Sequence, residues 1–227
     1  MNSDKQKLLT LIHTGDSSNI ILAFKIASSQ NLDLQIDWEG YRRILSRDRE
    51  DEAKDYISAN DLVDLFNREK LTLFCILNET KIPEELQYFT GIKDLYLSGC
   101  SHYSFPEFIF NFPKLENLTI SWFNMEFIPN EISNLKNLQQ LRISYCNVKS
   151  FPDELFGLKN LFSIDFSGNK MINLPERIGA LKRLRFLELS NNPLHKLPKS
   201  FYSLELVSLG IHDTHLNTDE LLLLLQS

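Results

Sequence analysis

The feature that most constrains this chain is a proline that returns every 23 residues. A large apolar residue precedes each of these prolines, and leucines, isoleucines and phenylalanines recur at fixed places between them. A fixed period of this length is typical of a stack of similar structural units, each packed on its neighbours. The series is Pro83, Pro106, Pro129, Pro152, Pro175 and Pro198.

Each unit starts with the pattern L-x-x-L-x-L, as in Leu184, Leu187 and Leu189. Counting from the first leucine, positions 4 and 6 lie on one side of a short strand, so both point into the core. The proline ends this half because it has no N–H to donate. Apolar residues three and six positions later, such as Ile178 and Leu181, are expected to be buried on the opposite side. Stacked units then share one core and one parallel sheet. Units start at Leu71 (irregular), Ile92, Leu115, Leu138, Leu161, Leu184 and Leu206 (shortened).

The pattern L-x-x-L-x-L-x-x-N-x-L-x-x-L-P, which residues 184–198 follow, resembles the leucine-rich repeat family. The resemblance is to its 23-residue intracellular class, found in Ras-binding scaffold, scribble-like and many bacterial proteins, and it covers residues 71–217. It implies an α/β fold, a curved solenoid with one parallel sheet on the concave face that binds a partner. Position 9 departs from the family's Asn at Phe123, where we expect a locally distorted loop; Cys100, Cys146 and Thr214 are usual substitutes.

The two ends do not follow the repeat, and we expect them to cover its open core. Residues 1–70 are predicted to form a helical N-terminal cap, residues 71–217 about seven repeats, and residues 218–227 a C-terminal capping helix. The leucines of that last helix leave self-association open as an alternative. A docking role for Arg42, Arg43, Arg47 and Arg49 is also open, although acidic residues interleave with them. The N-terminal helices are expected at Asp4–His13 (ended by Gly15), from Asp16 or Ser17 onward, near Trp38–Ser46 and at Asn60–Arg68.

Composition narrows the class of partner and the cellular setting. With 24 Lys and Arg against 30 Asp and Glu, the chain lacks the overall basic charge that nucleic-acid binding usually requires. No apolar stretch reaches the roughly 20 residues of a membrane span, and the first residues turn polar too early for a signal peptide. Three cysteines cannot form a paired disulfide framework. We therefore expect a cytoplasmic protein that binds neither nucleic acid nor membrane.

The sequence contains none of the common motifs that indicate catalysis or a bound cofactor. No nucleophile elbow, zinc-protease helix, C-x-x-C or phosphate-binding loop occurs in the sequence. Cys100 and Cys146 lie at the inward position 9, where a buried thiol is inert. His212, Asp213 and His215 are too few to complete a metal site. We expect no enzyme, no metal and no cofactor.

The surface left for binding is the outer side of the sheet. Positions 3, 5, 7 and 8 are expected to face solvent, position 7 being Ser98, Ser121, Ser144, Ser167 and Ser190. Trp122, Tyr145 and Arg142 fall on adjacent strands, and these residue types are enriched where interfaces concentrate their binding energy. Asp165 and Glu188 lie side by side as like charges, which costs stability unless a cation is present. Alternatively, Arg142 already pairs with Asp165. The predicted partner-binding residues are Tyr96, Trp122, Arg142, Tyr145, Asp165, Phe186 and Glu188.

These observations favour a protein–protein interaction module that binds a partner, possibly through a basic patch on that partner, on the concave sheet. A second hypothesis is a sensor or effector that binds a small ligand or peptide in the same concavity, which would require an enclosed pocket. A third is an enzyme that uses the N-terminal helical region.

Overall fold

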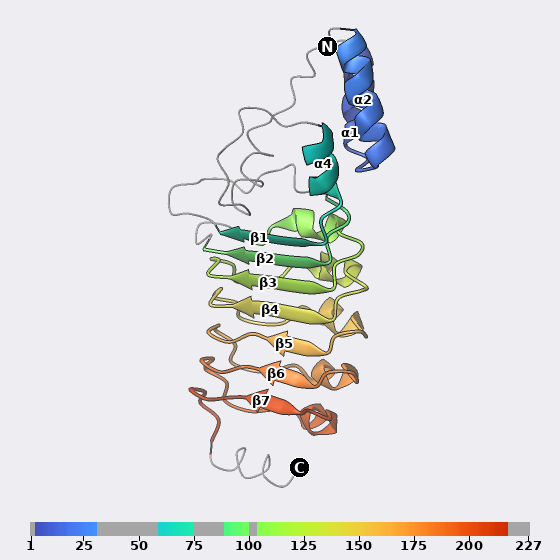
Figure 1. The fold of residues 1–227 in the computed structure, drawn as a ribbon. Coiled ribbons are helices and arrows are strands. Elements are labelled where there is room, and N and C mark those ends of the chain that lie inside the picture. Colours follow the sequence, from blue (N-terminus) through green and yellow to red (C-terminus); the bar gives the residue numbers. More distant parts are fainter. Residues whose placement is uncertain (1–2, 31–58, 75–88, 100–103, 218–227) are drawn as a thin grey trace.

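The computed structural model describes residues 3–30, 59–74, 89–99 and 104–217. In these segments the chain forms a solenoid whose strands make one seven-stranded parallel sheet in sequence order (Figure 1). From β2 to β6, neighbouring strands pair residues that are 23 apart, so the sequence period is also the register of this part of the sheet. The strands are β1 (Lys70–Phe74), β2 (Asp94–Ser98), β3 (Asn117–Ser121), β4 (Gln140–Ser144), β5 (Ser163–Asp165), β6 (Phe186–Glu188) and β7 (Ser208–Gly210).

Short 3-10 helices form the side opposite the sheet, and each follows a proline of the 23-residue series. The proline fixes φ near the value that a helix start requires, and its lack of an N–H costs no hydrogen bond at that position. From Pro106 to Pro175, the apolar residues at the two predicted places beyond each proline are buried, as Ile178 and Leu181 illustrate. Beyond Pro198, Phe201 is buried and Leu204 is half-buried. The helices are η2 (Glu107–Asn111), η3 (Asn130–Asn134), η4 (Asp153–Gly157), η5 (Glu176–Ala180) and η6 (Lys199–Ser203).

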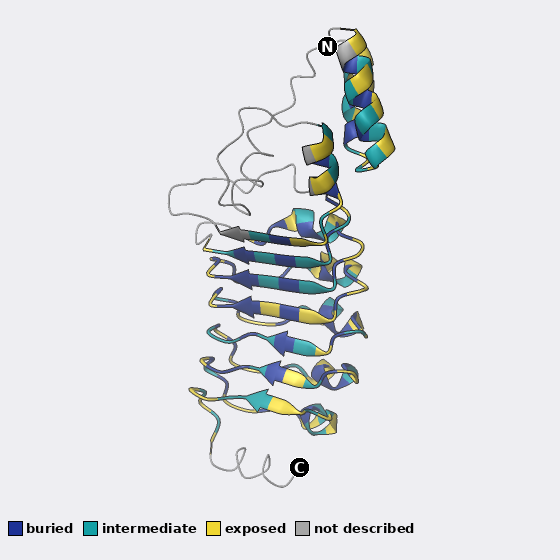
Figure 2. Ribbon diagram, in the orientation of Figure 1, coloured by how far each residue is buried: buried dark blue, intermediate teal, exposed yellow. Residues whose placement is uncertain are grey.

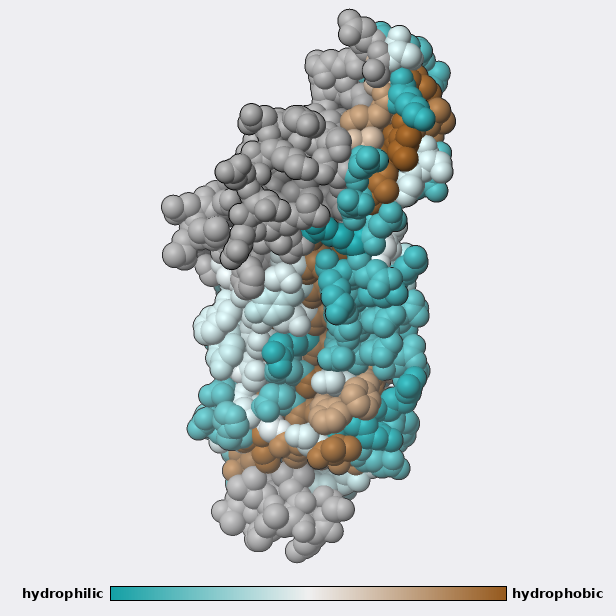
Figure 3. Space-filling model, in the orientation of Figure 1, coloured by the Kyte–Doolittle hydropathy of each residue, from teal (hydrophilic) through white to brown (hydrophobic). Residues whose placement is uncertain are grey.

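One continuous apolar core fills the space between the sheet and the 3-10 helices. Positions 4 and 6 of the units are buried from β2 to β6, and Figure 2 shows buried and exposed residues alternating along the strands. Each repeat therefore completes the core of the one before it, as stacked units do. On the face of the repeats that Figure 3 shows, the surface is largely hydrophilic to neutral, and the broadest apolar area lies over β6 and β7.

A helical cap stands at the N-terminal end of the solenoid (Figure 1). Its helices in the described residues are α1 (Ser3–Ile12), α2 (Ser17–Ser29) and α4 (Ala59–Phe66). Gly15 has φ 70° in the turn after α1, and the side chain of Asp16 accepts a hydrogen bond from the N–H of Asn19 at the start of α2, both as predicted. α4 connects the cap to the repeats, because the Phe66 ring packs edge-on against Phe89 with centroids 4.9 Å apart.

Several sequence expectations lie outside the described residues. These are the helix near Trp38–Ser46, the four arginines between 42 and 49, the first proline of the series, Cys100 and the C-terminal helix at 218–227. Within the described part of the chain, no helix is long and apolar enough to cross a membrane.

Candidate functional site

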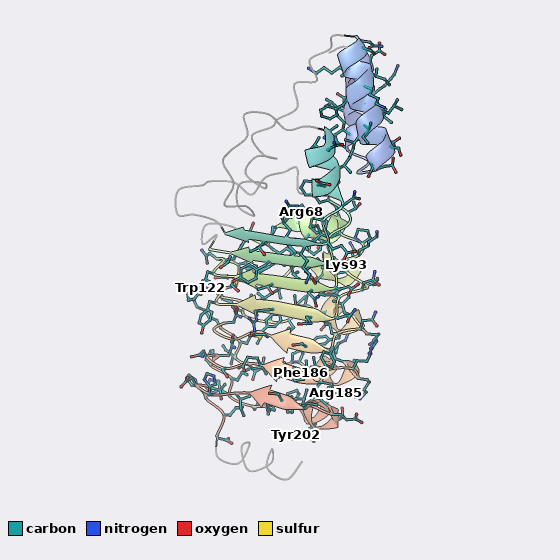
Figure 4. The ribbon with its side chains drawn as sticks, viewed as in Figure 1. Arg68, Lys93, Trp122, Arg185, Phe186 and Tyr202 are labelled. Carbon is teal, nitrogen blue, oxygen red and sulfur yellow. The ribbon has the colours of Figure 1, made fainter. Side chains whose placement is uncertain are left out.

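Two stacked aromatic rings form the most distinctive feature on the surface of the repeats. Trp122 and Tyr145 lie in the turns that directly follow β3 and β4, one repeat apart. Their ring centroids are 4.4 Å apart with planes only 4° from parallel, and the residues remain 56% and 43% exposed. The repeat predicts that these two residues are neighbours, and the structure confirms it. Figure 4 shows Trp122 beyond the carboxyl ends of the strands, so the pair lies at the rim of the sheet.

The backbone of both residues has a conformation that bulky side chains rarely adopt. Trp122 has φ 64° and Tyr145 φ 55°, in the left-handed region where the Cβ atom crowds the following carbonyl. Position 8 has a positive φ in every unit from β2 to β7, so the turn itself requires it. The other units place there the residue types that tolerate this conformation, namely Gly99, Gly168, Asn191 and Asp213.

This regularity also corrects the expectation of a distorted loop at Phe123. The residue before it, Trp122, keeps the same left-handed turn as its equivalents, and Phe123 is buried in the core. The N–H of Met125 bonds the carbonyl of Cys146 at 3.0 Å, which supplies a backbone acceptor where other units use a side chain. The large apolar ring is accommodated by the core and leaves the turn unchanged.

Gly168 leaves room for the Tyr145 ring because it has no side chain. A Cβ atom at Gly168 would lie 2.4 Å from Cδ1 of Tyr145, far inside van der Waals contact. The ring of Tyr145 is therefore held between the ring of Trp122 on one side and the bare backbone of Gly168 on the other. Contact on both sides fixes the orientation of the pair before any partner arrives.

Charged side chains on the face of the sheet are already engaged with one another. Nε of Arg142 lies 2.7 Å from Oδ2 of Asp165. Oδ1 of Asp165 accepts hydrogen bonds from the N–H and the hydroxyl of Ser167, and Oε1 of Glu188 accepts one from the N–H of Ser190 at 2.8 Å. The structure thus shows the alternative in which Arg142 satisfies Asp165. Glu188, by contrast, forms no ion pair with any described basic residue.

Two other predicted site residues lie apart from the aromatic pair. Tyr96 is half-buried on β2, beside Thr119 of β3. Phe186 lies at the start of β6, the end of the strands opposite Trp122 (Figure 4), where its ring packs edge-on against Phe162 at 5.0 Å. The seven predicted residues therefore extend across the sheet from β2 to β6 and are not confined to the aromatic pair.

The sequence pattern did not single out Phe162 or Val207, two exposed apolar residues that lie two repeats apart. Both occupy position 2, which the alternation of the strand assigns to the core side, yet they are 43% and 73% exposed. Position 2 precedes the strand proper, so the alternation does not apply to it. The sequence does carry a signal of this exposure. Position 2 is Glu116, Gln139 or Arg185 in other repeats, but a large apolar residue in these two.

The serines at position 7 differ from the expectation drawn from the sequence. Ser121, Ser144 and Ser190 are buried, although they were expected to face solvent. The hydroxyls of Ser121 and Ser144 lie 2.9 Å apart in a hydrogen bond, and that of Ser190 accepts from the N–H of His212 at 3.1 Å. The left-handed turn at position 8 bends the chain inward over this position, and only a small hydroxyl that can find a partner fits.

Groups that could carry chemistry are engaged structurally in the described residues. Cys146 is buried with its thiol near the carbonyl of Ser144 at 3.1 Å, and burial raises its pKa to about 11, so it stays protonated and unreactive. Nδ1 of His212 lies 3.0 Å from the carboxylate of Asp213, and the rings of His195 and His215 are neighbours. No group of three or more potential metal ligands occurs in the part of the chain that the structure describes.

Comparison with known proteins agrees with this geometry. Residues 136–194 match the leucine-rich repeat family model. A leucine-rich-repeat protein of Leptospira interrogans is 30% identical, with a TM-score of 0.58 over 63% of this chain and 37% of its own. Internalin C2 of Listeria monocytogenes is 18% identical, with a TM-score of 0.59 over 77% and 73% of the two chains. The leucine-rich-repeat domain of the type III effector XopL is 20% identical, with a TM-score of 0.55 over 88% and 71%.

The fold is that of a leucine-rich-repeat solenoid. The chain spans little more than a third of the length of the Leptospira protein. None of the curated proteins compared with the chain matches it.

Asn169 shows how the leucine-rich repeats are joined at their turns. Its Oδ1 accepts from the N–H groups of Cys146 and Val148 in the preceding repeat, at 3.1 and 3.0 Å. Its Nδ2 donates to the carbonyls of Ile143 and Phe166. Asn192 makes the equivalent bonds one repeat later. These amides satisfy backbone groups that would otherwise be buried without partners, and they hold the position 8 turns in a regular row.

Proposed function

We propose that this chain is a non-enzymatic module that binds a protein partner on the concave side of its sheet, anchored by Trp122 and Tyr145 at the rim. The observation that carries the proposal is the stacked, exposed pair held in left-handed backbone. Each residue in that conformation costs about 1–2 kcal/mol relative to glycine. Strain of this kind persists where the surrounding structure fixes it, and it clusters at binding sites.

The pair has the properties of an interface anchor. Tryptophan and tyrosine dominate the residues whose truncation weakens protein complexes most, since they offer a large contact area with few rotatable bonds. The Trp122 ring is fixed by Tyr145, which is fixed in turn by Gly168. A partner that covers these rings therefore loses little side-chain entropy on this side of the interface.

The concave face beside the pair supplies polar complementarity. Arg142 keeps an exposed guanidinium while it is paired with Asp165, so the two together offer donors and acceptors with little net charge. Glu188 is the acidic group for which a basic residue of the partner remains to be supplied. We therefore place the contact with a basic patch of the partner at Glu188, with Tyr96 and Phe186 at the margins of the surface.

The setting proposed for this module is the cytoplasm, and the class is the 23-residue one. The support is the unbroken spacing of 23 residues from β2 to β6 and the three cysteines, which cannot form a paired disulfide framework. Solved relatives with the same fold include bacterial leucine-rich-repeat proteins.

The experiment that tests the proposal compares partners captured by the parent chain and by Trp122→Gly with Tyr145→Gly. Glycine suits the backbone at both positions, so the double variant is expected to stay folded while it loses the anchor. Phe127→Ser is the matched control, because Phe127 is also an exposed aromatic residue but lies beyond the turn. A protein that is retained by the parent and by the control, and lost by the double variant, is then titrated by calorimetry. Equal binding to all three chains would contradict the proposal.

A further inference from the structure

An apolar patch lies at the end of the strands opposite Trp122, formed by Phe162, Phe186 and Val207. The two phenylalanine rings meet edge-on with planes at 64°, which leaves a face open to solvent. Arg185 lies between them and Val207 in the ladder, because its N–H bonds the carbonyl of Phe162 and its carbonyl accepts from the N–H of Val207. Figure 3 shows this apolar surface over β6 and β7, with hydrophilic surface beside it.

A row of basic residues lies at the same end of the strands as the patch. It consists of exposed side chains in the loops that lead into β3 to β6, three of them exactly one repeat apart and hence stacked. Hydrogen bonds connect these loops: Nδ2 of Asn160 donates to the carbonyl of Lys136 at 3.0 Å, and Nη1 of Arg183 donates to Oδ1 of Asn160 at 3.1 Å. The basic row is Lys114, Lys136, Lys159, Lys182 and Arg183.

None of these five cations forms an ion pair with a carboxylate of the described residues. The contacts that they do make are with neutral groups: Nζ of Lys159 bonds the carbonyl of Phe156 at 2.8 Å, and Nζ of Lys182 the hydroxyl of Ser203 at 3.4 Å. The contrast is Arg185, whose guanidinium pairs with Glu205 at 3.0 Å. Like charges stacked along one edge repel, although the protein as a whole is acidic, with a net charge of −6.

We propose that this edge binds an acidic protein segment that carries one or two large apolar side chains. The apolar side chains would cover the Phe162–Phe186 pair and Val207, while carboxylates of the segment would neutralise the basic row. A bare polyanion such as nucleic acid would use the cations but leave the apolar patch uncovered, and it would be repelled by the net negative charge of the protein. The inference concerns a surface that does not include the Trp122–Tyr145 anchor, although it shares Phe186 with the margin of the proposed concave surface.

The test selects peptides of 16 residues from a random display library against the full chain. The expected binders are rich in Asp and Glu and contain one or two Phe, Trp, Leu or Ile residues. Their affinity, measured by fluorescence anisotropy, should fall about tenfold or more for Phe162→Ser with Val207→Ser. Lys182→Glu should weaken binding and make it less sensitive to salt. Lys170→Glu, an exposed lysine elsewhere on the repeats, is the matched charge control and should bind as the parent does.

The variant Trp122→Gly separates this inference from the proposed function. Selected peptides should bind it as tightly as the parent, and loss of binding would show that the edge is not a distinct site. Failure to select edge-dependent binders, or selection of peptides without acidic residues, would overturn the proposal. So would duplex DNA or phosphatidylserine vesicles that bind through Lys182 regardless of Phe162. A dimer of the chain that dissociates on Phe162→Ser would show that a second copy is the occupant.

Discussion

At the scale of the single residue, position 8 forms the turn that closes each strand and also carries the proposed binding anchor. The turn that closes each strand needs a left-handed residue, and four of the six repeats satisfy it with Gly, Asn or Asp. Trp122 and Tyr145 adopt the same left-handed conformation, although the Cβ atom of each makes it unfavourable. Stacking of the two rings returns about 0.5–1.5 kcal/mol, roughly the size of the strain at one of them. The stability of the fold therefore does not explain why tryptophan and tyrosine occur at position 8, whereas a role in binding does.

The strain at Trp122 predicts an inverted order of stability for two substitutions. Both Trp122→Ala and Trp122→Gly remove the stacking, but only glycine relieves the left-handed backbone. We expect the glycine variant to unfold with a free energy about 1 kcal/mol higher than the alanine variant, measured in urea. Thr119 is the control, since it lies in the extended strand β3. There the glycine variant should be less stable than the alanine variant by about 0.5–1 kcal/mol. The same order at both positions would contradict the strained turn.

At the scale of the element, the sequence predicts the repeats better than the surface. The 23-residue spacing fixes the parallel register, the inward positions 4 and 6 and the apolar residues buried on the opposite side, because burial in a stacked unit depends on position in the repeat. It also predicts the contact between Trp122 and Tyr145. It does not predict that Ser144 is buried or that Phe162 is exposed, since both lie at strand ends where the alternation stops. The pairing of Arg142 with Asp165 depends on side-chain geometry that the sequence leaves open.

Consecutive 3-10 helices are connected by Glu176, which predicts a pH dependence of stability. Its carboxylate accepts from the N–H groups of Ser200 and Lys199 at the start of η6, and the hydrogen bonds with Ser200 hold the pKa of Glu176 below its ordinary value. A lowered pKa means that the ionised form stabilises the fold above the ordinary pKa and that this contribution is lost as pH falls through the folded value.

Thermal unfolding of the parent and Glu176→Gln should therefore differ at pH 7, with the parent more stable, and converge in acid below pH 4. Glu131→Gln on η3 is the control and should show no such convergence, because Glu131 is exposed and no hydrogen bond of this kind is present there among the described residues. A difference that persists unchanged at low pH would exclude the carboxylate as its source.

The helical cap should be required for the stability of the first repeat. Deletion of residues 1–68 removes Phe66 from Phe89 and exposes Leu71, which is buried in the intact chain. Loss of one large buried ring costs about 3–5 kcal/mol, so we expect aggregation or a large fall in melting temperature. Phe66→Ala should reproduce part of the fall, whereas Leu22→Ala, at an exposed site on α2, should not. A truncated protein that stays soluble and melts as the parent does would show that the cap is an independent domain.

At the scale of the whole molecule, the two proposed surfaces lie at opposite ends of the strands of one sheet, the anchor after β3 and β4 and the apolar patch at the starts of β5, β6 and β7. The stack of repeats makes this possible, because each strand contributes one residue to each end of the face, and neighbouring repeats add to both rows. Trp122 and Phe186 differ by five positions along the strand and by three repeats across the sheet. At about 3.3 Å per residue and about 4.8 Å per strand, these offsets place them about 22 Å apart.

That separation predicts competition between the two ligands. A protein interface of ordinary size covers about 800 Å² on each side, a patch about 32 Å across. The anchor lies at the rim, so a footprint of this width that extends across the sheet to Glu188, as proposed, also reaches Phe186. The partner should therefore displace an acidic peptide bound there, which titration of the partner into a labelled peptide complex would measure. Trp122→Gly should abolish the displacement but leave peptide affinity unchanged. Simultaneous binding of both ligands would show that the partner approaches from the rim and leaves the face of β6 uncovered, because only such an approach keeps Phe186 accessible while the aromatic anchor is occupied.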